Sequence, residues 1–233
     1  MNTPHNTLDM SAVNSAMQMF AREAGHRARE IQGKLGEPKS KDGEVLVAAN
    51  IVTEADMLVG RLAEDFFTRM FPGCVVIQEE TADKVRTELI MDDTLVFIVD
   101  PVDGTLFYAA GSFGWTVSVG AFRNWEPLAG CIFAPVMGDM YYTAGERSYL
   151  NGREIHAHVS QESLKGSIML KHMRDYYSVR TFPGYTLSYG SIALHLALTA
   201  SGLACACVTS KHKVHDVAGA AKILQNAGAE LRY

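Results

Sequence analysis

The segment from residue 95 to 106, "LVFIVDPVDGTL", combines an apolar run with groups that could bind a metal ion and a phosphate. The apolar run ends on Asp100, and Pro101, which lacks an N–H, is expected to end strand pairing there. Asp103, Gly104 and Thr105 follow where a short helical turn is expected to start. A helix start offers free N–H groups to an anion, and glycine lets a backbone approach closely. Two carboxylates would repel that anion unless a divalent cation lay between them, and oxygen ligands suit magnesium. The segment therefore predicts a magnesium-assisted phosphate site.

Further acidic residues fall at the ends of expected strands or at the starts of expected helices. Glu79 follows the apolar run "VVIQ", Asp56 lies near the start of one helix, and Asp216 lies at the start of another. Ligand groups collect at such positions in open α/β folds. An isolated Asp-Gly pair is more often a solvated turn with an Asp cap, and residues 103–104 alone leave that interpretation open. Acidic positions on four separate elements are more than one turn needs.

Hydrophobic periodicity predicts a layered arrangement of helices and sheets. Apolar residues at steps of three and four indicate helices, and short β-rich apolar runs indicate buried strands. The expected helices cover residues 8–35, 53–71, 191–201 and 217–227. The expected strands are "CVVIQ", "LVFIV", "GSIML", "LACACV" and an antiparallel meander across residues 115–150. This order predicts an α/β fold of the α+β layered kind.

The composition is that of an ordinary globular enzyme. The chain has 233 residues, a hydrophobic fraction of 48%, a charged fraction of 20% and a net charge of −5. It has no long Lys/Arg run, no apolar stretch that could span a bilayer, and a polar start unlike a signal peptide. We therefore expect neither a nucleic acid nor a membrane as partner. Four cysteines in such a chain predict free thiols and a cytoplasmic location.

Two phosphatase families share part of the D-P-V-D-G-T motif. The haloacid dehalogenase family places a nucleophilic Asp two residues before a second Asp, but Pro101 occupies that position here. The motif instead resembles the D-P-[ILV]-D-G-[TS] signature of the inositol monophosphatase family. Four further segments are similar to elements of that family in the same order: "IVTEAD", "QEE", "YGSIALHLALTASGLACACV" and "HDVAGAAKILQNAGA". A haloacid-dehalogenase-type phosphatase is the second alternative.

The resemblance implies a sugar-phosphatase-type α-β-α-β-α sandwich and a role for each motif residue. Oxygen ligands would bind two to three Mg²⁺ ions, and they would come from Glu79, Asp100, the Val102 carbonyl, Asp103 and Asp216. Thr105 and Asp56 would orient and deprotonate the attacking water, while the N–H groups of Gly104 and Thr105 would hold the phosphate. Ser191 and Thr209 would contact the substrate. The resemblance also implies lithium sensitivity and a homodimer.

Three positions depart from the family pattern. His215 replaces a Trp before the last acidic ligand. We interpret that Trp as a packing residue and expect the ligand to survive the change. Ala204 replaces an Asp in the G-x-x-D-A element. Thr209 aligns with an acidic residue that many members use on the sugar hydroxyls. This argues against inositol monophosphate as substrate, because polar pockets discriminate through specific hydroxyl pairing.

A zinc cluster is a weaker interpretation of nearby residues. Cys205, Cys207, His212 and His215 carry suitable ligand atoms. A C-x-C pair in a strand, however, usually points its thiols to opposite faces. We therefore favour an apolar strand over a zinc site.

Several cationic residues could approach the expected site. Lys39 or Lys41 could reach a third metal position, although both are expected to be solvated loop residues. Lys171, His172 and Arg174 follow an expected strand and could contact a second anionic group of the substrate. A surface charge cluster is the plainer interpretation of residues 171–174.

We interpret residues 1–233 as a single inositol-monophosphatase-like domain of two lobes. The chain stops at "GAELRY", before the family pattern does, so a final strand and helix are expected to be missing from it. The expected function is a magnesium-dependent phosphomonoesterase, in which a metal-activated water directly attacks a small phosphorylated polyol, sugar or nucleotide. The alternative is a catalytically impaired relative that acts as a regulatory or binding protein. The complete set of expected ligands argues against that alternative.

Overall fold

The computed structural model describes residues 8–32, 54–84, 90–158, 165, 168–172, 182–210 and 212–232. Its helices are α1 (Met10–Ile31), α2 (Glu54–Met70), the 3₁₀ helix η2 (Glu79–Lys84), α3 (Thr105–Ala109), α4 (Ile192–Ala200) and α5 (Val214–Ala227). Its strands are β1 (Val75–Gln78), β2 (Val96–Asp103), β3 (Thr116–Arg123), β4 (Glu126–Ala134), β5 (Asp139–Ala144), β6 (Arg147–Leu150), β7 (Arg153–Glu154), β8 (Ile168–His172), β9 (Tyr185–Leu187) and β10 (Ala206–Thr209). Within the described residues, these elements confirm the expected helices and strands, with shifted boundaries.

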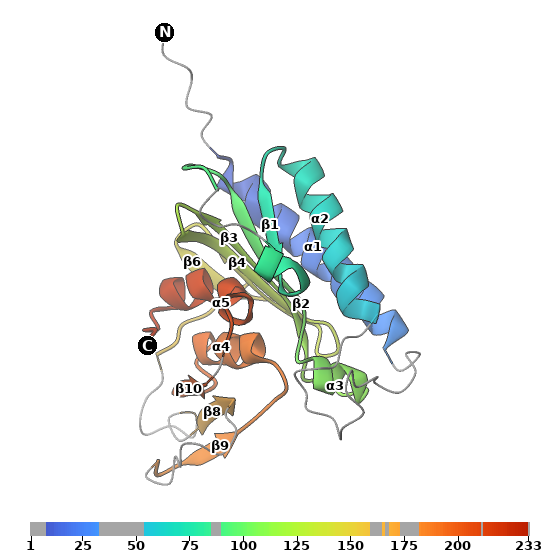
Figure 1. Cartoon of the computed structure of the whole chain (residues 1–233). Helices are drawn as coiled ribbons and strands as arrows, with labels where there is room; N and C mark the ends of the chain where they lie inside the picture. The colour runs from blue at the N-terminus through green and yellow to red at the C-terminus, as the bar shows by residue number, and fades with distance from the viewer. Residues whose placement is uncertain are drawn as a thin grey trace.

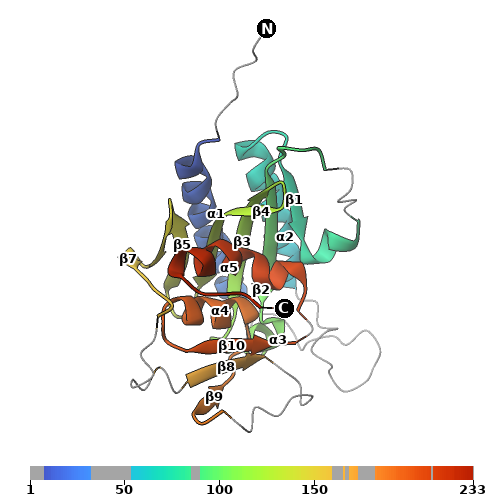
Figure 2. The same cartoon turned by 90° about the vertical axis from the view of Figure 1, so that its left-hand side faces the viewer.

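The elements form successive layers. Helices α1 and α2 cover one face of a seven-stranded sheet ordered β1-β2-β3-β4-β5-β6-β7, and α5 lies on the other face (Figure 1). A three-stranded sheet, ordered β10-β8-β9, packs against α4 below α5 (Figure 2). Strands β1 and β2 are parallel, whereas neighbouring strands from β2 to β7 are antiparallel. The described residues thus confirm the predicted layered α/β class. Their layers run α-β-α-β, and the last helical layer of the expected α-β-α-β-α sandwich is not found among them.

Apolar cores on both faces of the large sheet hold β2 in place. On the side of α1 and α2, Phe67 stacks on Phe97 with ring centroids 4.1 Å apart. On the side of α5, Ile98 packs in a cluster with Ala218. Burying one large apolar side chain contributes roughly 1.5–3 kcal/mol. Strand β2 therefore lies between two packed layers, which fixes the position of its carboxyl end.

Strand β2 continues past Asp100, which corrects the expectation that Pro101 ends its pairing. Asp100 pairs with Ser118 of β3 and Asp103 pairs with Thr116, with a register shift between the two pairs. Pro101 lies inside this irregularity, where its missing N–H interrupts no regular ladder. Residues three apart in a regular strand point to opposite faces. The shift lets both aspartates enter one buried cluster.

Helix α5 approaches the large sheet very closely because glycines lie at the contact. A Cβ atom added to Gly120 of β3 would collide with the carbonyl oxygen of Ala218. A Cβ atom on Gly219 of α5 would likewise collide with the Ser118 hydroxyl. This close approach brings the first turn of α5, which carries Asp216, to the end of β2.

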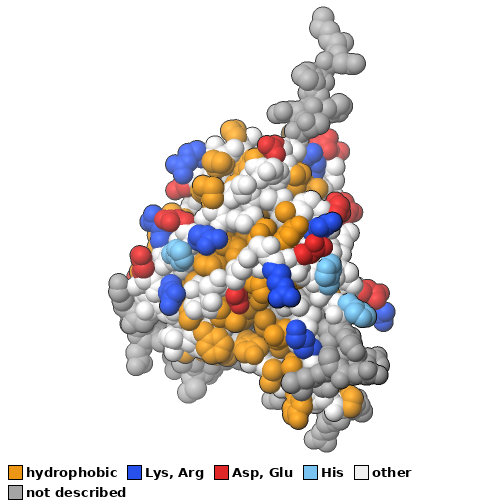
Figure 3. All heavy atoms as spheres, turned by 180° about the vertical axis from the view of Figure 1, so that it is seen from behind, with side chains coloured by type: hydrophobic (Ala, Val, Ile, Leu, Met, Phe, Trp, Pro, Cys, Tyr) orange, Lys and Arg blue, Asp and Glu red, His pale blue; other side chains and the backbone are white. Residues whose placement is uncertain are grey.

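The surface is mixed in character. On the face opposite to that in Figure 1, hydrophobic side chains lie among charged side chains of both signs (Figure 3). Exposed apolar residues such as Met19 are common on protein surfaces and need no special explanation. Among the described residues, no helix has the length and apolar character needed to cross a membrane.

Replacing Gly120 with Ala should push α5 away from the sheet. The added methyl group would meet backbone atoms of α5, and overpacking of this kind costs about 1–3 kcal/mol. We expect a lower Tm. Because Asp216 moves with α5, we also expect weaker binding of Mn²⁺, measured by titration with the free-ion EPR signal.

Gly138→Ala is the matched control. Gly138 has a φ of +75°, and an added Cβ would have no neighbour within 4 Å. This variant should lose about 1 kcal/mol through backbone strain and leave α5 in place. Equal losses of Mn²⁺ affinity in the two variants would contradict the link between α5 and the metal ligands.

Candidate active site

Four carboxylates converge where β1, β2 and α5 meet. Strands β1 and β2 are parallel, and Gln78 pairs with Val99. The next residues, Glu79 and Asp100, therefore lie at the same edge of the sheet. Asp100 is 1% exposed, whereas the Glu79 side chain is 33% exposed. The site is thus built from one deeply buried acid and one acid at the rim.

The potential ligand atoms form two overlapping groups. Within each group all atoms lie within 4.8 Å of one another; the groups are Glu79, Asp100 and His215, and Asp100, Asp103 and Asp216. Asp100 belongs to both groups and lies between them. Two adjacent cation positions that share a carboxylate fit this arrangement.

Asp103 is held in place by the start of α4. Its Oδ2 accepts a hydrogen bond from the Ser191 hydroxyl at 2.6 Å and from the Ala193 N–H at 2.5 Å. The Ser191 oxygen in turn accepts from the Leu194 N–H at 2.8 Å, which caps α4, and lies 3.0 Å from the Thr116 hydroxyl. Ser191 is fully buried. Its hydroxyl positions Asp103, while its expected contact with substrate stays a prediction.

Burial and mutual repulsion disfavour the charged forms of Asp100 and Asp103 when no cation is bound. Burial raises the pKa of Asp100 well above its usual range, and the charges of Asp103, Glu79 and Asp216 raise it further. Burial also raises the pKa of Asp103 to about 7, although the hydrogen bond from Ser191 opposes part of this shift. Among the described residues, Asp100 Oδ1 is buried and has no hydrogen-bond partner. Oxygen ligands under such repulsion fit a hard divalent cation.

The start of α5 brings cationic and acidic groups together. Asp216 Oδ2 accepts a hydrogen bond from the Lys213 N–H at 2.6 Å, and Lys213 Nζ lies 3.4 Å from Glu79 Oε1. His215 Nε2 lies 3.7 Å from Glu79 Oε1 and 3.5 Å from Asp216 Oδ1. Sequence reasoning did not include Lys213 and treated His215 as a replacement for a packing residue. The position of His215 directly before a predicted ligand was the signal available.

The remaining motif residues, two in the turn after β2 and one on α2, lie next to the carboxylates. The Thr105 hydroxyl donates to the Val102 carbonyl at 3.1 Å. Gly104 precedes α3 with a φ of 93°, and a Cβ there would meet the Gly114 carbonyl at 2.7 Å. Asp56, on α2, is 3% exposed, and its charge contributes to the raised pKa of Asp100. All three motif residues therefore lie at the edge of the acidic cluster.

Other predicted residues lie elsewhere or outside the described residues. Thr209 ends β10, where it pairs with His172 of β8. Within the described part of the chain, its hydroxyl is buried and has no hydrogen-bond partner. Lys39, Lys41 and Arg174 lie outside the described residues.

The zinc interpretation finds no support among the residues that the structure describes. Their candidate metal groups contain His215 together with acidic residues, and neither Cys205 nor Cys207 takes part. The Cys205 thiol is exposed and donates to the Ile168 carbonyl at 3.1 Å.

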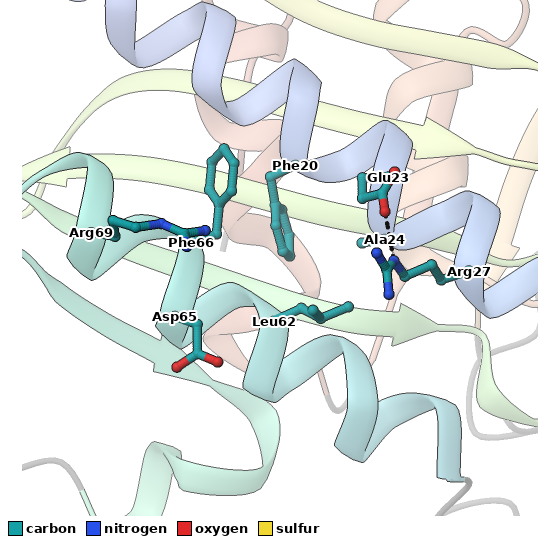
Figure 4. Close-up of a pocket in the computed structure, with 8 residues that line it drawn as sticks. All are labelled: Phe20, Glu23, Ala24, Arg27, Leu62, Asp65, Phe66 and Arg69. Atoms are coloured by element: carbon teal, nitrogen blue, oxygen red, sulfur yellow. Dashed lines mark hydrogen bonds and ion pairs between the residues drawn. The ribbon is translucent and has the colours of Figure 1, made fainter.

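A separate hollow of about 420 Å³ lies between α1 and α2 (Figure 4). It is lined by Phe20, Glu23, Ala24, Arg27, Leu62, Asp65, Phe66 and Arg69. None of these residues belongs to the predicted site, and the Arg27–Glu23 pair at 2.6 Å neutralises part of its charge. The groove is therefore distinct from the acidic cluster.

A layered α/β fold with an acidic cluster at strand ends is an arrangement that could hold metal ions. Comparison with known proteins gives the family. A model of the inositol monophosphatase family matches residues 2–233. The chain therefore belongs to the inositol monophosphatase family and is a phosphoric monoester hydrolase. Membership of this family decides against the haloacid dehalogenase alternative.

Curated relatives agree with this membership. Inositol monophosphatase 1 of Solanum lycopersicum is 30% identical over 94% of this chain and 86% of its own length. Inositol-1-monophosphatase of Bacillus subtilis is 26% identical over 93% and 83%. Fructose-1,6-bisphosphatase of Pyrococcus furiosus is 28% identical over 82% of this chain and 75% of its own length.

Solved structures share the fold. An inositol monophosphatase of Thermotoga maritima superposes with a TM-score of 0.78 at 23% identity, covering 94% of this chain and 84% of that chain. An inositol monophosphatase II of Staphylococcus aureus, with inositol monophosphate bound, superposes with a TM-score of 0.73 at 21% identity, covering 93% and 80%. At these identities the likeness concerns the fold.

The raised pKa values predict that the metal-free protein loses stability as the pH rises. Between the ordinary Asp pKa of about 3.9 and the folded Asp103 pKa of about 7, the folded state binds more protons than the unfolded state. The free energy of unfolding therefore falls with pH across this window. With EDTA present, Tm should drop by several degrees between pH 5 and pH 8.

Added magnesium should reverse this trend, because the cation competes with protons for the same carboxylates. The increase in Tm caused by 10 mM Mg²⁺, roughly the level that saturates a weak oxygen-ligand site, should be larger at pH 8 than at pH 5. A metal-free Tm that rises with pH across this window would contradict the electrostatic description of the site.

Proposed function

We propose that the protein is a magnesium-dependent phosphomonoesterase that hydrolyses a small phosphorylated sugar, polyol or nucleotide by direct attack of water on phosphorus. The observation that carries the proposal is the convergence of carboxylates from η2, β2 and α5 in two overlapping groups around the buried Asp100. The repulsion within this cluster supports a cation as its natural occupant. Because the ligand groups overlap at Asp100, we propose two ions, with a third held more weakly at Glu79.

The chain would hold these ions through oxygen atoms at the end of β2. Glu79, Asp100 and the Val102 carbonyl would bind the first ion, and Asp100, Asp103 and Asp216 would bind the second. When bound, magnesium supplies positive charge to phosphate oxygens and makes water more acidic. Asp103 is already fixed by α4, so little reorganisation would be needed on binding.

The residues of the turn after β2 would orient the reactants. We propose that Thr105, whose hydroxyl is held at the Val102 carbonyl, orients the attacking water together with the buried Asp56. The N–H groups of Gly104 and Thr105 would bind the phosphate, because the first N–H groups of a helix have no partner within it. Holding water and phosphate in line is the main catalytic contribution of such side chains.

The free thiols support one lesser part of the proposal, the compartment. Cys74, Cys131, Cys205 and Cys207 are all unpaired, which fits a reducing, cytoplasmic compartment. We also propose a homodimer, following the family resemblance. Size-exclusion chromatography with light scattering would show twice the 25.5 kDa chain mass for a dimer.

Asp103→Asn should abolish most activity while leaving the fold intact. The amide keeps an oxygen that can accept from Ser191 and removes one buried charge. Loss of one electrostatic group of this kind typically costs about 100-fold in kcat. The increase in Tm on adding magnesium should also disappear at pH 8, whereas the metal-free Tm should not fall.

Asp65→Asn provides the control, because Asp65 is an exposed carboxylate on α2 in the separate groove. It should keep both kcat and the magnesium response. Phosphate release from a panel of phosphorylated metabolites is the activity measurement. Near wild-type turnover by Asp103→Asn would remove Asp103 from the proposed metal ligands.

Direct attack by water predicts that no carboxylate becomes phosphorylated. A single turnover in heavy-oxygen water should place the label in the released phosphate and leave Asp100 and Asp103 unlabelled. Mass spectrometry of the peptides that contain these residues would detect any exchange. Label in either carboxylate would indicate an aspartyl-phosphate intermediate and would sink the proposed mechanism.

The substrate is proposed to carry a second anionic group. Thr209 and the buried Ala204 supply no carboxylate for sugar hydroxyls, while Lys213 lies at the rim beside Glu79. A relative named fructose-1,6-bisphosphatase is compatible with this. Cationic donors favour anionic substrates over neutral ones.

We therefore expect a higher kcat/KM for a bisphosphorylated sugar or nucleotide than for inositol 1-phosphate. Lys213→Gln and Lys171→Gln should reduce the preference for the bisphosphorylated substrate, measured as the ratio of the two kcat/KM values. Arg153→Gln on β7 should leave that ratio unchanged. Arg174, also implicated by sequence, lies outside the described residues and should be tested by Arg174→Ala. A preference for inositol 1-phosphate in the wild-type enzyme would count against the second anionic group and leave the phosphatase proposal standing.

A further inference from the structure

We propose that His215 is itself a metal ligand, acting with Glu79 and Asp100 at the first ion position. A nitrogen ligand there would shift the preference of the site from Mg²⁺ toward Mn²⁺, Co²⁺ or Zn²⁺. This inference rests on the proposed metal-dependent function and deepens it, because it gives this chain a mixed nitrogen and oxygen site.

The positions of the atoms support the assignment. His215 Nε2 lies 3.7 Å from Glu79 Oε1 and 3.5 Å from Asp216 Oδ1. Two ligands bonded at about 2.1 Å to one tetrahedral or octahedral ion lie about 3.0–3.4 Å apart. The ligand atoms of Glu79, Asp100 and His215 all lie within 4.8 Å of one another. Movements of a few tenths of an ångström to about one ångström would complete a metal site.

The burial of the imidazole makes its present surroundings unfavourable without a cation. His215 is 2% exposed, and its Nδ1 has no hydrogen-bond partner among the described residues. If Nδ1 carries the proton, the lone pair of Nε2 faces two carboxylate oxygens. If Nε2 carries it, both oxygens are too distant for good hydrogen bonds. When Nδ1 carries the proton, a cation between Nε2 and the carboxylates would accept the Nε2 lone pair and remove its repulsion with the oxygens.

The chemistry of the ligands gives the direction of the shift in preference. Magnesium favours oxygen ligands and retains water, whereas imidazole suits transition metals and zinc. Asp100 and Glu79 bind either class of ion. The Trp found at this position in the family pattern has an indole N–H that cannot act as a neutral lone-pair donor. The change to His therefore adds a ligand rather than only a different packing group.

A purely electrostatic role for His215 is the competing interpretation. A protonated imidazole would partly neutralise Glu79 and Asp216 and would never bond to the metal. Both interpretations predict that replacing His215 weakens the site. Only direct coordination places a nitrogen nucleus on the metal, so the test must detect that nucleus.

Pulsed EPR of the Mn²⁺-loaded protein makes this distinction. Wild-type protein at pH 7.5 should show electron spin-echo modulation from a directly bound ¹⁴N nucleus. Protein grown with ¹⁵N-histidine should show the ¹⁵N pattern instead. His215→Phe, which keeps an apolar ring of similar size, should lose the modulation. His212→Asn, at an exposed position three residues before His215, is the matched control and should keep it.

Binding constants give a second measurement that needs no activity assay. Isothermal titration should show Mn²⁺ affinity reduced by about tenfold or more in His215→Phe, the loss typical of disturbing a metal site. Mg²⁺ affinity should change much less. His215→Trp, which carries the residue of the family pattern, should behave like His215→Phe and guards against a folding defect particular to Phe.

The outcomes separate this inference from the proposed function. Bound Mn²⁺ without histidine modulation in wild-type protein would overturn the role of His215 and leave the metal-dependent phosphatase intact. Equal losses of Mn²⁺ and Mg²⁺ affinity in both folded variants would also overturn it, in favour of the electrostatic role. No binding of either ion by wild-type protein would overturn the metal-dependent function together with this inference.

Discussion

The repulsion between carboxylates buried at the end of β2 is the constraint on which the site depends. Asp100 and Asp103 are almost inaccessible to water, and further acidic groups lie close by. An unpaired charge in such surroundings is costly, so the group either binds a proton or is matched by a cation. The fold must hold these carboxylates together against their electrostatic repulsion. Packing elsewhere in the protein supplies the opposing stabilisation.

The two layers of helices provide that opposition. Helices α1 and α2 bury aromatic residues against one face of β2, and α5 packs on the other face. Strand β2 therefore cannot move away from the repulsive cluster without opening a core. At its end, Asp103 is tied to the first turn of α4 through Ser191. The acidic site is thus fixed by packing on both sides and by one buried hydrogen-bond network.

Local sequence patterns predicted the elements and most of the residues that meet at the site. Helical periodicity located α1 and α2, and apolar runs located β1 and β2, because burial on one or both faces leaves a periodic signature. The sequence did not reveal that β2 resumes pairing after Pro101. That pairing depends on Thr116 of β3, and nothing within the D-P-V-D-G-T motif encodes its partner strand.

The sequence also did not predict contacts between residues far apart in the chain, because a local motif does not encode its distant partners. Ser191 follows Asp103 by 88 positions, and only the packing of α4 beneath the large sheet brings them together. His215 was assigned by analogy to a packing position, because its neighbour across the site, Glu79, lies on another element. A single sequence indicates which side chains could bind a metal, but the orientation of each ligand depends on tertiary packing.

The proposed function would divide the site between two sheets, which would have a consequence for specificity. The proposed metal ligands come from the large sheet and α5, whereas Thr209 comes from β10 of the small sheet. If Thr209 contacts the substrate as proposed, a substitution on β10 would change that contact without moving Asp100 or Asp103. The loss of an acidic group at Thr209 is therefore compatible with intact phosphate chemistry. On this architecture, the reaction and the choice of substrate can vary separately, because different packed elements position the groups responsible for each.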